Sequence, residues 1–311
     1  MRIVFLGSGA FAVPSLLALV DAGHEVAALV TQPDRQKGRG QALAPPPTRP
    51  VAESRGLPVL QLRRVRDPEA QDALRALRPE LQVVVAFGQI LPRAVIDIAP
   101  LGTVNVHASL LPLLRGAAPI QWAIASGLAE TGVTTMLIDE GLDTGPTLLQ
   151  SALAIGPDET AAELSPRLAA LGAALLLETI EGLAAGRLRP KPQDQARATL
   201  APLLAKEDGR VDWTLPARTI ANRARGFTPW PGAFAFHAGR LLKLVRVAPL
   251  DAAAPAQAGP GEVVAVRPEV VVACGGGTRL RLLEVQPESR RPMPSSSWAA
   301  GARVAPGHRL D

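Results

Sequence analysis

The sequence predicts an α/β protein of two domains, the first built on a doubly wound, mostly parallel sheet and the second a smaller β-domain. Three observations support this prediction. The chain of 311 residues is longer than a single typical domain, which holds roughly 100–200 residues. Apolar runs of strand length alternate with helical patterns up to about residue 190. Beyond that point, short strands are separated by Pro or Gly.

The first domain, residues 1–189, begins with the strand-like run IVFL, a helical stretch and a second strand, EVAALVT. Later runs such as VVVAF are rich in β-branched residues, which indicates strands buried on both faces and hence a parallel sheet covered by helices. Ala and Leu at helical spacing predict a helix from about Thr160 to Gly186, which closes the domain. This order of elements is typical of a Rossmann-like fold.

The polar, proline-bearing segment at 190–205 has no periodicity and is typical of a linker. After it, residues 206–311 contain GAFAFHAGRLLKLVRV, which predicts a hairpin that turns at His237–Arg240. Together with further short runs, this hairpin predicts a small β-barrel or sandwich. Its core is expected to contain the side chains of Trp213, Trp230, Trp298 and Cys274.

Basic residues are concentrated in two places. Residues 206–311 hold 15 Lys and Arg against 9 Asp and Glu, whereas residues 1–205 hold 18 against 19. Within the first part, the segment Arg35–Arg66 carries eight basic residues and one acid, Glu53. Two basic surfaces on an otherwise acidic body indicate a polyanionic partner. An Arg-rich solvated surface without a partner is the alternative.

Composition argues against several other classes of protein. With 47% apolar and 20% charged residues, the chain is far from the composition of disordered proteins. A single cysteine allows neither an internal disulfide nor a thiolate metal cluster, which favours the cytoplasm. The apolar stretch Leu168–Leu177 is shorter than the ~20 residues that span a bilayer, so we expect no membrane segment. No long exposed apolar face is evident, so we expect a monomer.

The pattern Gly7-x-Gly9-x-x-Ala12 follows the first predicted strand and opens a helix, as in the dinucleotide-binding fingerprint. That fingerprint expects an acid at the end of the second strand, where this chain has Thr31 and Gln32. The pattern therefore favours a tight turn of a doubly wound fold. A nicotinamide-dependent dehydrogenase is the alternative.

Three polar residues form the candidate catalytic set. Asn105 and His107 are two apart in the strand TVNVH, so both side chains project from one face near the end of that strand. Asp143 lies between glycines in GLDTG, which allows a tight turn toward the strand. An amide, an imidazole and a carboxylate suit acyl transfer, because they can stabilise an oxyanion, hold a proton and orient the imidazole. No His, Cys or carboxylate cluster has metal-ligand spacing.

These residues lie in motifs that resemble the formyltransferase superfamily, whose members use 10-formyltetrahydrofolate. The matching segments are NVH at 105–107, SLLP at 109–112, RGAAP at 115–119 and GLDTG at 141–145. Within the superfamily, the enzymes that formylate methionyl-tRNA are the most similar, on the segments QPDR at 32–35, GRG at 38–40, KEDG at 206–209 and FTPWPGAF at 227–234. The similarity runs from residue 3 to about 246 and is weaker beyond.

The resemblance implies transfer of a formyl group from 10-formyltetrahydrofolate, without a metal, to the free amino group of charged initiator tRNA in translation initiation. It implies that the catalytic residues are Asn105, His107 and Asp143. It implies that the folate is contacted by Ser109, Leu110, Leu111 and Pro112. It implies that tRNA is contacted by Arg35, Lys37, Arg39 and Lys206.

The resemblance also implies that the second domain is an OB-like barrel that holds the inner side of the tRNA. Two departures from the family concern RNA contacts rather than acyl chemistry. Leu113–Leu114 stand where the family often has a basic and an aromatic residue, and Gln41–Leu43 lack lysine.

Other functions remain as alternatives. A formyltransferase that acts on a small amine, such as an amino sugar nucleotide or glycinamide ribonucleotide, would share the Asn-His-Asp core. The basic loop, the basic second half and the PWPGAF segment favour tRNA over these acceptors. A protein that binds RNA without catalysis is a further alternative, and it would bind tRNA without turnover.

Overall fold

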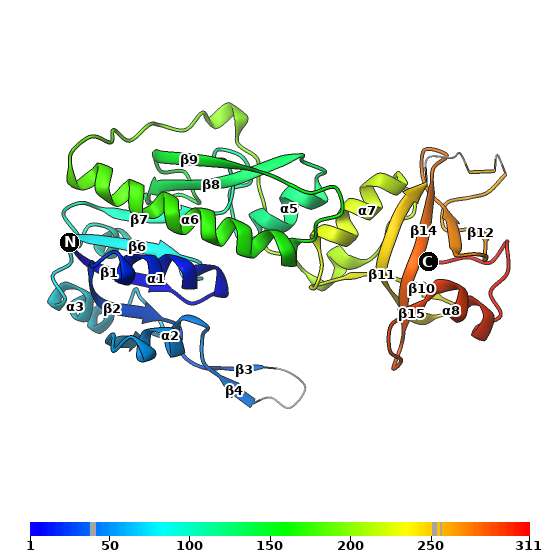
Figure 1. Cartoon of the computed structure of the whole chain (residues 1–311), viewed down its shortest axis with the longest axis horizontal. Coiled ribbons are helices and arrows are strands. Elements are labelled where there is room, and N and C mark those ends of the chain that lie inside the picture. Colours follow the sequence, from blue (N-terminus) through cyan, green and yellow to red (C-terminus); the bar gives the residue numbers. More distant parts are fainter. Residues whose placement is uncertain (38–41, 251–253, 256) are drawn as a thin grey trace. The chain divides into compact units, whose positions relative to one another are not determined.

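The computed structural model describes residues 1–37, 42–250, 254–255 and 257–311 (Figure 1). Contacts within these residues divide the chain into two compact units. Unit 1 comprises Met1–Pro119, Glu130–Ala154 and Ser165–Pro202. Unit 2 comprises Ile120–Ala129, Ile155–Leu164 and Leu203–Asp311. Residues 190–202, which belong to the predicted linker, thus lie in unit 1.

The centre of unit 1 is a sheet with the strand order β5-β2-β1-β6-β7-β8-β9. Its strands are β1 (Arg2–Gly7), β2 (Glu25–Thr31), β5 (Val59–Gln61), β6 (Leu81–Val85), β7 (Thr103–His107), β8 (Glu130–Leu137) and β9 (Thr147–Ala154). From β5 to β7 neighbouring strands run parallel, whereas β8 is antiparallel to β7 and β9 is antiparallel to β8. The predicted doubly wound, mostly parallel sheet is confirmed.

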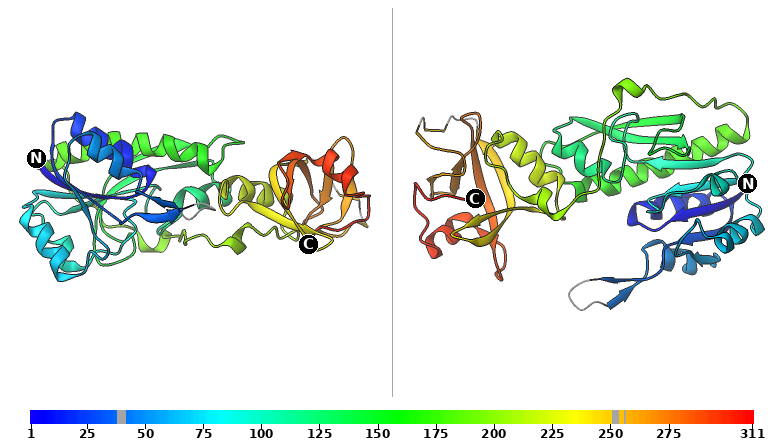
Figure 2. Two further views of the ribbon diagram at one scale, coloured as in Figure 1. Left: turned by 90° about the horizontal axis from the view of Figure 1, so that it is seen from below. Right: turned by 180° about the vertical axis from the view of Figure 1, so that it is seen from behind.

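Helices cover both faces of this sheet. In Figure 2, α1 and α6 lie on one face and α3 lies on the other. Up to Ala184 the chain contains η1 (Ala10–Ala12), α1 (Val13–Asp21), α2 (Thr48–Ser54), α3 (Pro68–Ala76), α4 (Arg93–Ile96), α5 (Pro119–Ala125) and α6 (Ala161–Ala184), with the small hairpin β3 (Arg35–Lys37) and β4 (Ala42–Ala44). The helix predicted over 160–186 is confirmed in α6.

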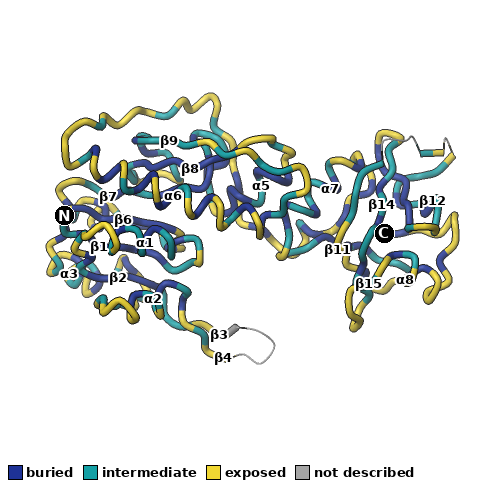
Figure 3. Tube along the Cα trace, viewed as in Figure 1, coloured by how far each residue is buried: buried dark blue, intermediate teal, exposed yellow. Residues whose placement is uncertain are grey.

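The central strands are buried because both of their faces are covered (Figure 3). Every residue from Leu81 to Val85 is buried, including Gln82, whose amide donates to Val95 O and Thr103 Oγ1 at 2.7 and 2.9 Å. Gly172 of α6 lies so close to the sheet that a Cβ there would be 3.0 Å from Val106 Cγ1. Val106 therefore faces α6.

Unit 2 is built on an antiparallel half-barrel with the strand order β10-β11-β14-β13-β12, and β15 pairs with β14. Its elements are η3 (Lys206–Gly209), α7 (Ala217–Gly226), β10 (Ala233–His237), β11 (Arg240–Leu250), β12 (Val263–Ala265), β13 (Val270–Ala273), β14 (Arg279–Pro287), β15 (Met293–Pro294) and α8 (Ser295–Gly301). The predicted hairpin is confirmed: β10 and β11 are joined by Ala238 and Gly239, both with positive φ. A short helix, η2 (Gln195–Arg197), lies in unit 1.

The core of unit 2 contains three of the four side chains predicted for it. Trp213, Trp298 and Cys274 are at most 7% exposed, and burial raises the pKa of the Cys274 thiol to about 12. Trp230 was predicted to be buried as well, but this prediction is wrong, since its side chain is 54% exposed. Trp230 lies among prolines and glycine in the turn between α7 and β10, outside both elements.

Candidate active site

Strand β7 presents Asn105 and His107 on the face opposite to Val106, and therefore away from α6. Asn105 is half-buried and His107 is only 5% exposed. The side chain of Asn105 makes no hydrogen bond with the residues that the structure describes. Its amide is therefore free to donate to a ligand.

Both nitrogens of the His107 ring face acceptors. Nε2 lies 3.0 Å from the carbonyl oxygen of Leu114, and Nδ1 lies 3.6 Å from Oδ2 of Asp143. A carbonyl can only accept, so Nε2 carries a proton and donates it to Leu114. Nδ1 is therefore the nitrogen that Leu114 does not engage, and it lies beside the carboxylate of Asp143.

Asp143 lies in the loop between β8 and β9, and this loop runs back along β7. It begins beside the first residue of β7, where Ile138 N–H donates to Thr103 O at 2.8 Å, and Asp143 reaches His107 at the other end. Asp143 adopts a left-handed backbone with φ of 51°. The turn is tight, because a Cβ on Gly145 would lie 1.9 Å from Leu137 O.

The carboxylate of Asp143 is fixed by a backbone donor. Its Oδ2 accepts the N–H of Gly116 at 2.8 Å, and the side chain is 17% exposed. Gly116 has φ of 121°, and a Cβ there would lie 2.6 Å from Ala201 O. The segment that contains Ala201 thus packs closely against the loop that contains Gly116.

The segment predicted to contact the folate, Ser109–Pro112, is held from several sides. Ser109 is fully buried, and its Oγ donates to Leu113 O at 2.6 Å. Thr134 Oγ1 donates to Ser109 O at 2.7 Å and accepts from Leu111 N at 3.0 Å. Because the hydroxyl of Ser109 is fully buried and its proton is donated to Leu113 O, this segment offers a ligand its backbone and apolar surface rather than that hydroxyl.

The glycine turn after β1 packs against the end of β2. Ser8 Oγ accepts from Gln32 N at 3.1 Å and from Thr31 Oγ1 at 3.0 Å. Hydroxyl and amide groups thus occupy the place where a dinucleotide site has its ribose-binding carboxylate. The turn stabilises the fold here, and the geometry gives no support to the nicotinamide alternative.

The basic loop predicted to contact tRNA is a hairpin whose described residues are mostly exposed. Arg35 opens β3 and donates to Gln32 Oε1, and Lys37 ends β3. The predicted contact Arg39 lies outside the described residues. Leu43, on β4, is 71% exposed.

A polar cluster holds the base of this hairpin. Asp34 accepts from Gln61 Nε2 at 2.7 Å and from Arg49 at 3.0 Å. The pKa of Asp34 lies below its ordinary value, chiefly because of the Gln61 hydrogen bond and further because of Arg49. Gln32 Nε2 donates to Phe87 O at 2.8 Å, which ties the hairpin to the segment after β6.

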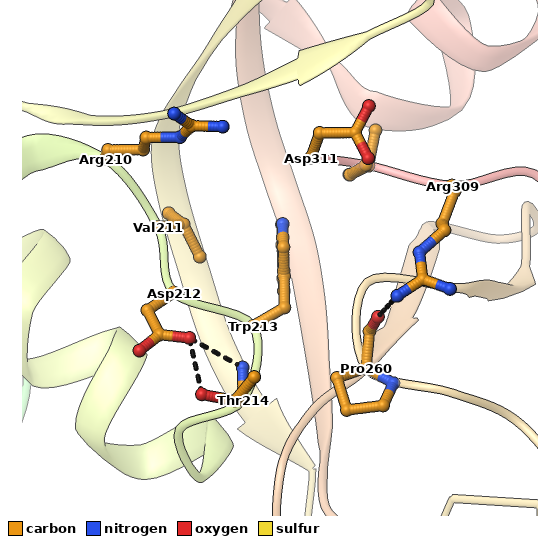
Figure 4. Close-up of a pocket in the computed structure, with 9 residues that line it drawn as sticks. Arg210, Val211, Asp212, Trp213, Thr214, Pro260, Arg309 and Asp311 are labelled. Atoms are coloured by element: carbon orange, nitrogen blue, oxygen red, sulfur yellow. Dashed lines mark hydrogen bonds between the residues drawn. The ribbon is translucent and has the colours of Figure 1, made fainter.

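The fourth predicted tRNA contact, Lys206, begins η3 in unit 2 and is exposed. Unit 2 also has a cavity of about 530 Å³, drawn in Figure 4. Two arginines and two aspartates are among its lining residues, which are Arg210, Val211, Asp212, Trp213, Thr214, Pro260, Arg309, Leu310 and Asp311. Asp212 is bonded to Thr214, and Arg309 donates to Pro260 O. This cavity shares no residue with the Asn105, His107 and Asp143 cluster.

Sequence reasoning missed two residues beside the site. Arg115 was predicted only as the first residue of the RGAAP motif, and Gln193 lies in the predicted linker. In the structure Arg115 is 5% exposed and donates to Gln193 Oε1, while Gln193 Nε2 donates to the carbonyl oxygen of Asp143 at 2.8 Å. A polar segment without periodicity carries no signal for such a contact across 50 residues.

Neither a metal site nor a membrane span is found in the described part of the chain. Among those residues, no group of three or more His, Cys, Asp and Glu side chains could hold a metal ion. None of the helices that the structure describes has both the length and the apolar character to cross a bilayer.

Comparison with known proteins identifies the family. Residues 1–180 match the model of the formyl transferase family, and residues 203–303 match that of the formyl transferase C-terminal domain. Methionyl-tRNA formyltransferase of Solibacter usitatus is 53% identical over 310 residues, which cover 100% of this chain and 98% of that protein. Methionyl-tRNA formyltransferase of Anaeromyxobacter dehalogenans is 55% identical and covers 97% of each chain.

Solved structures share the fold. An N-formyltransferase from Helicobacter canadensis, solved with folinic acid and dTDP-3-aminofucose, superposes with a TM-score of 0.68 over 90% of this chain and 98% of that one. Its sequence is 16% identical, so this likeness concerns the fold alone. Both family models, the full-length relatives and the shared fold agree: the chain belongs to the formyl transferase family.

Proposed function

We propose that this enzyme transfers the formyl group of 10-formyltetrahydrofolate to the free amino group of methionyl-tRNA, and so supports translation initiation. The observation that carries the proposal is the gathering of Asn105, His107 and Asp143 on one face of β7, with His107 Nδ1 3.6 Å from Asp143 Oδ2. The relatives that match this chain over its full length are named for the same reaction.

The reaction needs stabilisation of charge rather than a metal or a covalent enzyme intermediate. The α-amine attacks the formyl carbon, and a tetrahedral oxyanion forms. Its collapse breaks the bond to N10 of the folate; the amine loses a proton and N10 gains one. The products are the formylated aminoacyl-tRNA and tetrahydrofolate.

Each catalytic residue has a role that follows from its position. Asn105 donates its free amide N–H to the oxyanion, where preorganised donors are most effective. His107 holds or transfers a proton at Nδ1, since its Nε2 already donates to Leu114 O. Asp143 orients the ring and balances the charge of the imidazolium.

The folate is proposed to lie against the backbone and apolar side chains of Ser109, Leu110, Leu111 and Pro112. The N–H of Leu111 donates to Thr134 Oγ1 and its carbonyl oxygen accepts from Gln150 Nε2, so the backbone of Leu111 is fixed from both sides. A segment fixed in this way loses little conformational entropy when it binds a ligand.

The tRNA is proposed to contact the basic hairpin through Arg35, Lys37 and Arg39, and the second domain through Lys206. The proposed domains are 1–189 for catalysis and 206–311 for tRNA, joined by 190–205. The excess of basic residues in 206–311 and the separate family matches of the two parts support this division.

The direct test is an assay with 10-formyltetrahydrofolate and methionyl-tRNA that detects a blocked amino terminus on the methionine. We expect turnover, and none with uncharged tRNA, which lacks the amine. Binding of tRNA without any formyl product would refute the proposal.

The salt dependence of the activity distinguishes methionyl-tRNA from a small amine as the acceptor. Counterion release makes binding to phosphates weaken steeply as salt rises. We therefore expect kcat/KM for methionyl-tRNA to fall by about 10-fold or more between 50 and 200 mM salt. A flat response, together with turnover of an amino sugar nucleotide, would support the alternative.

We also propose that the protein acts as a cytoplasmic monomer. Translation takes place in the cytoplasm, and the single cysteine suits a reducing compartment. Sedimentation equilibrium at assay concentration tests the monomer, since a dimer would double the 32.5 kDa mass.

A further inference from the structure

The charged group of Arg115 is buried beside the catalytic loop. Arg115 is 5% exposed, and its guanidinium donates to Gln193 Oε1 at 2.7 and 3.1 Å and to Gln195 Oε1 at 2.7 Å. A buried charge requires hydrogen-bond partners, and these amide oxygens supply them. Gln193 and Gln195 are therefore held in place by a residue of the 112–118 loop.

The amide of Gln193 links Arg115 to the loop that carries Asp143. Its Nε2 donates to the carbonyl oxygens of Asp143 and Gly145, at 2.8 and 2.7 Å. The orientation of this amide is fixed by its partners, because a guanidinium only donates and carbonyls only accept. Gln193 thus bonds on both sides of Thr144, across the left-handed turn.

Asp143 is consequently fixed at two points by neighbouring residues. Gly116 N–H donates to its carboxylate, and Arg115 holds its carbonyl through Gln193. The chain around Gln193 is itself anchored on both sides. Lys191 forms a two-way backbone bridge with Thr147, and Thr199 O accepts from Arg115 N at 2.9 Å.

We infer that Gln193 is a positioning residue for the formyl transfer, which acts by holding the Asp143 loop so that the carboxylate faces His107. The inference rests on the proposed role of Asp143. Gln193 thus has a kinetic role although the sequence around it indicates only a linker. Gln193 touches neither the imidazole nor the free amide of Asn105 in the described contacts.

The variant Gln193→Glu tests this role most directly. A glutamate keeps the oxygens that pair with Arg115 but places an acceptor where Nε2 donates to the two carbonyls. We expect kcat to fall by about 10- to 100-fold, because small displacements of a catalytic group have effects of this order. The KM values for the folate and for methionyl-tRNA should change by less than about threefold, since no binding contact is removed.

Gln195→Glu is the matched control. It makes the same chemical change in the same segment and faces the same arginine, but Gln195 has no described contact with the loop 141–145. We expect its kcat to stay within about twofold of the wild-type value, in the range of a surface change without catalytic effect. Thermal melting of both variants shows whether each is folded, and Gln193→Ala is the substitute if Gln193→Glu is not.

A double-mutant cycle with Asp143→Asn separates positioning from general stability. If Gln193 acts through Asp143, Gln193→Glu should reduce the residual single-turnover rate of Asp143→Asn by less than about threefold. Full additivity of the two losses, or a wild-type kcat for folded Gln193→Glu, would overturn the inference. If Asp143→Asn itself kept full activity, the proposed catalytic site would fail together with this inference.

Discussion

Two loops of unit 1 each carry some of the predicted functional residues, and they are held in different ways. The loop with Asp143 has hydrogen bonds to its carboxylate, to its carbonyl and across its turn, where Asp139 accepts from Thr144 Oγ1 at 2.7 Å. The hairpin β3–β4 is tied down at its base through Asp34 and Gln32, while Leu43 on it is 71% exposed.

This difference fits the two functions proposed for these loops, catalysis and tRNA binding. An oxyanion is stabilised best by groups fixed before the reaction, since no energy is then spent on reorienting them. Phosphates are attracted by exposed charges over several ångströms, and such attraction tolerates variable geometry. Changes in the first loop should therefore act on kcat, and changes in the hairpin should act on kcat/KM for tRNA.

The largest effect is expected for Asn105→Ala. It removes the free amide that faces the proposed oxyanion and should lower kcat by about 10²–10³-fold, as for other oxyanion donors. The measurement is single-turnover formyl transfer at saturating folate and tRNA. The loss should not add to that of His107→Ala, because residues that act as a unit show non-additive effects.

Asn105→Asp provides the control for shape. It keeps the size of the side chain but replaces the donor with a negative charge, so it should be at least as slow as Asn105→Ala. Near-normal activity of either folded variant would remove Asn105 from the catalytic set.

The next largest effect is expected for Gly145→Ala. A Cβ at this position would lie 1.9 Å from Leu137 O, so the loop must shift and Asp143 with it. We expect kcat to fall by about 10²-fold and the melting temperature to fall as well.

Gly301→Ala is the control for the same chemical change. Apart from its chain neighbours and the backbone of its own helix, no atom of the described residues lies within 4 Å of a Cβ there, and Gly301 ends helix α8. Its activity should be unchanged and its stability equal or slightly higher, because Ala favours a helix over Gly by roughly 0.5–1 kcal/mol. Equal activity of the two variants would mean that the Asp143 loop needs no fixed geometry.

Local patterns explain why much of the fold could be predicted from the sequence. The β-branched run at 83–85 and the Ala-Gly turn at 238–239 have signals within a few residues, and both were found where expected. Asn105 and His107 could be placed on one face because strand alternation has a strict period of two.

Such local patterns could not predict the contacts between segments that are distant in the sequence. The sequence does not indicate that Gln193 bonds to Asp143, or that Thr199 bonds to the loop at Arg115, because neither segment has a periodicity that specifies a partner. The exposure of Trp230 was missed for a related reason: residue type predicts burial only on average, and the surrounding turn decided it.

A smaller effect is expected for Arg35→Ala in the hairpin. Loss of one phosphate contact should lower kcat/KM for methionyl-tRNA by about 3- to 10-fold and reduce the slope of its salt dependence by about one. The kcat at saturating tRNA should stay unchanged. Arg75→Ala is the control, since Arg75 is an exposed arginine of α3 that pairs with Asp72 outside the hairpin. Equal salt slopes for the two variants would exclude Arg35 from the tRNA contact.

The smallest effect is expected for Asp34→Asn, which weakens the hydrogen bonds at the base of the hairpin but leaves the basic residues of the hairpin unchanged. We expect kcat/KM for methionyl-tRNA to fall by only about two- to fivefold, since a solvent-exposed ion pair contributes little to stability. The pKa of Asp34 is lowered by Gln61 and Arg49, so its stabilising contribution is complete above the ordinary value of about 3.9 and is lost only as pH falls through the lower, folded-state value. The ratio of wild-type to Asp34→Asn kcat/KM should therefore be constant from pH 8 to 5.5. A ratio that declines toward pH 5.5 would show that a group other than the Asp34 carboxylate holds the hairpin.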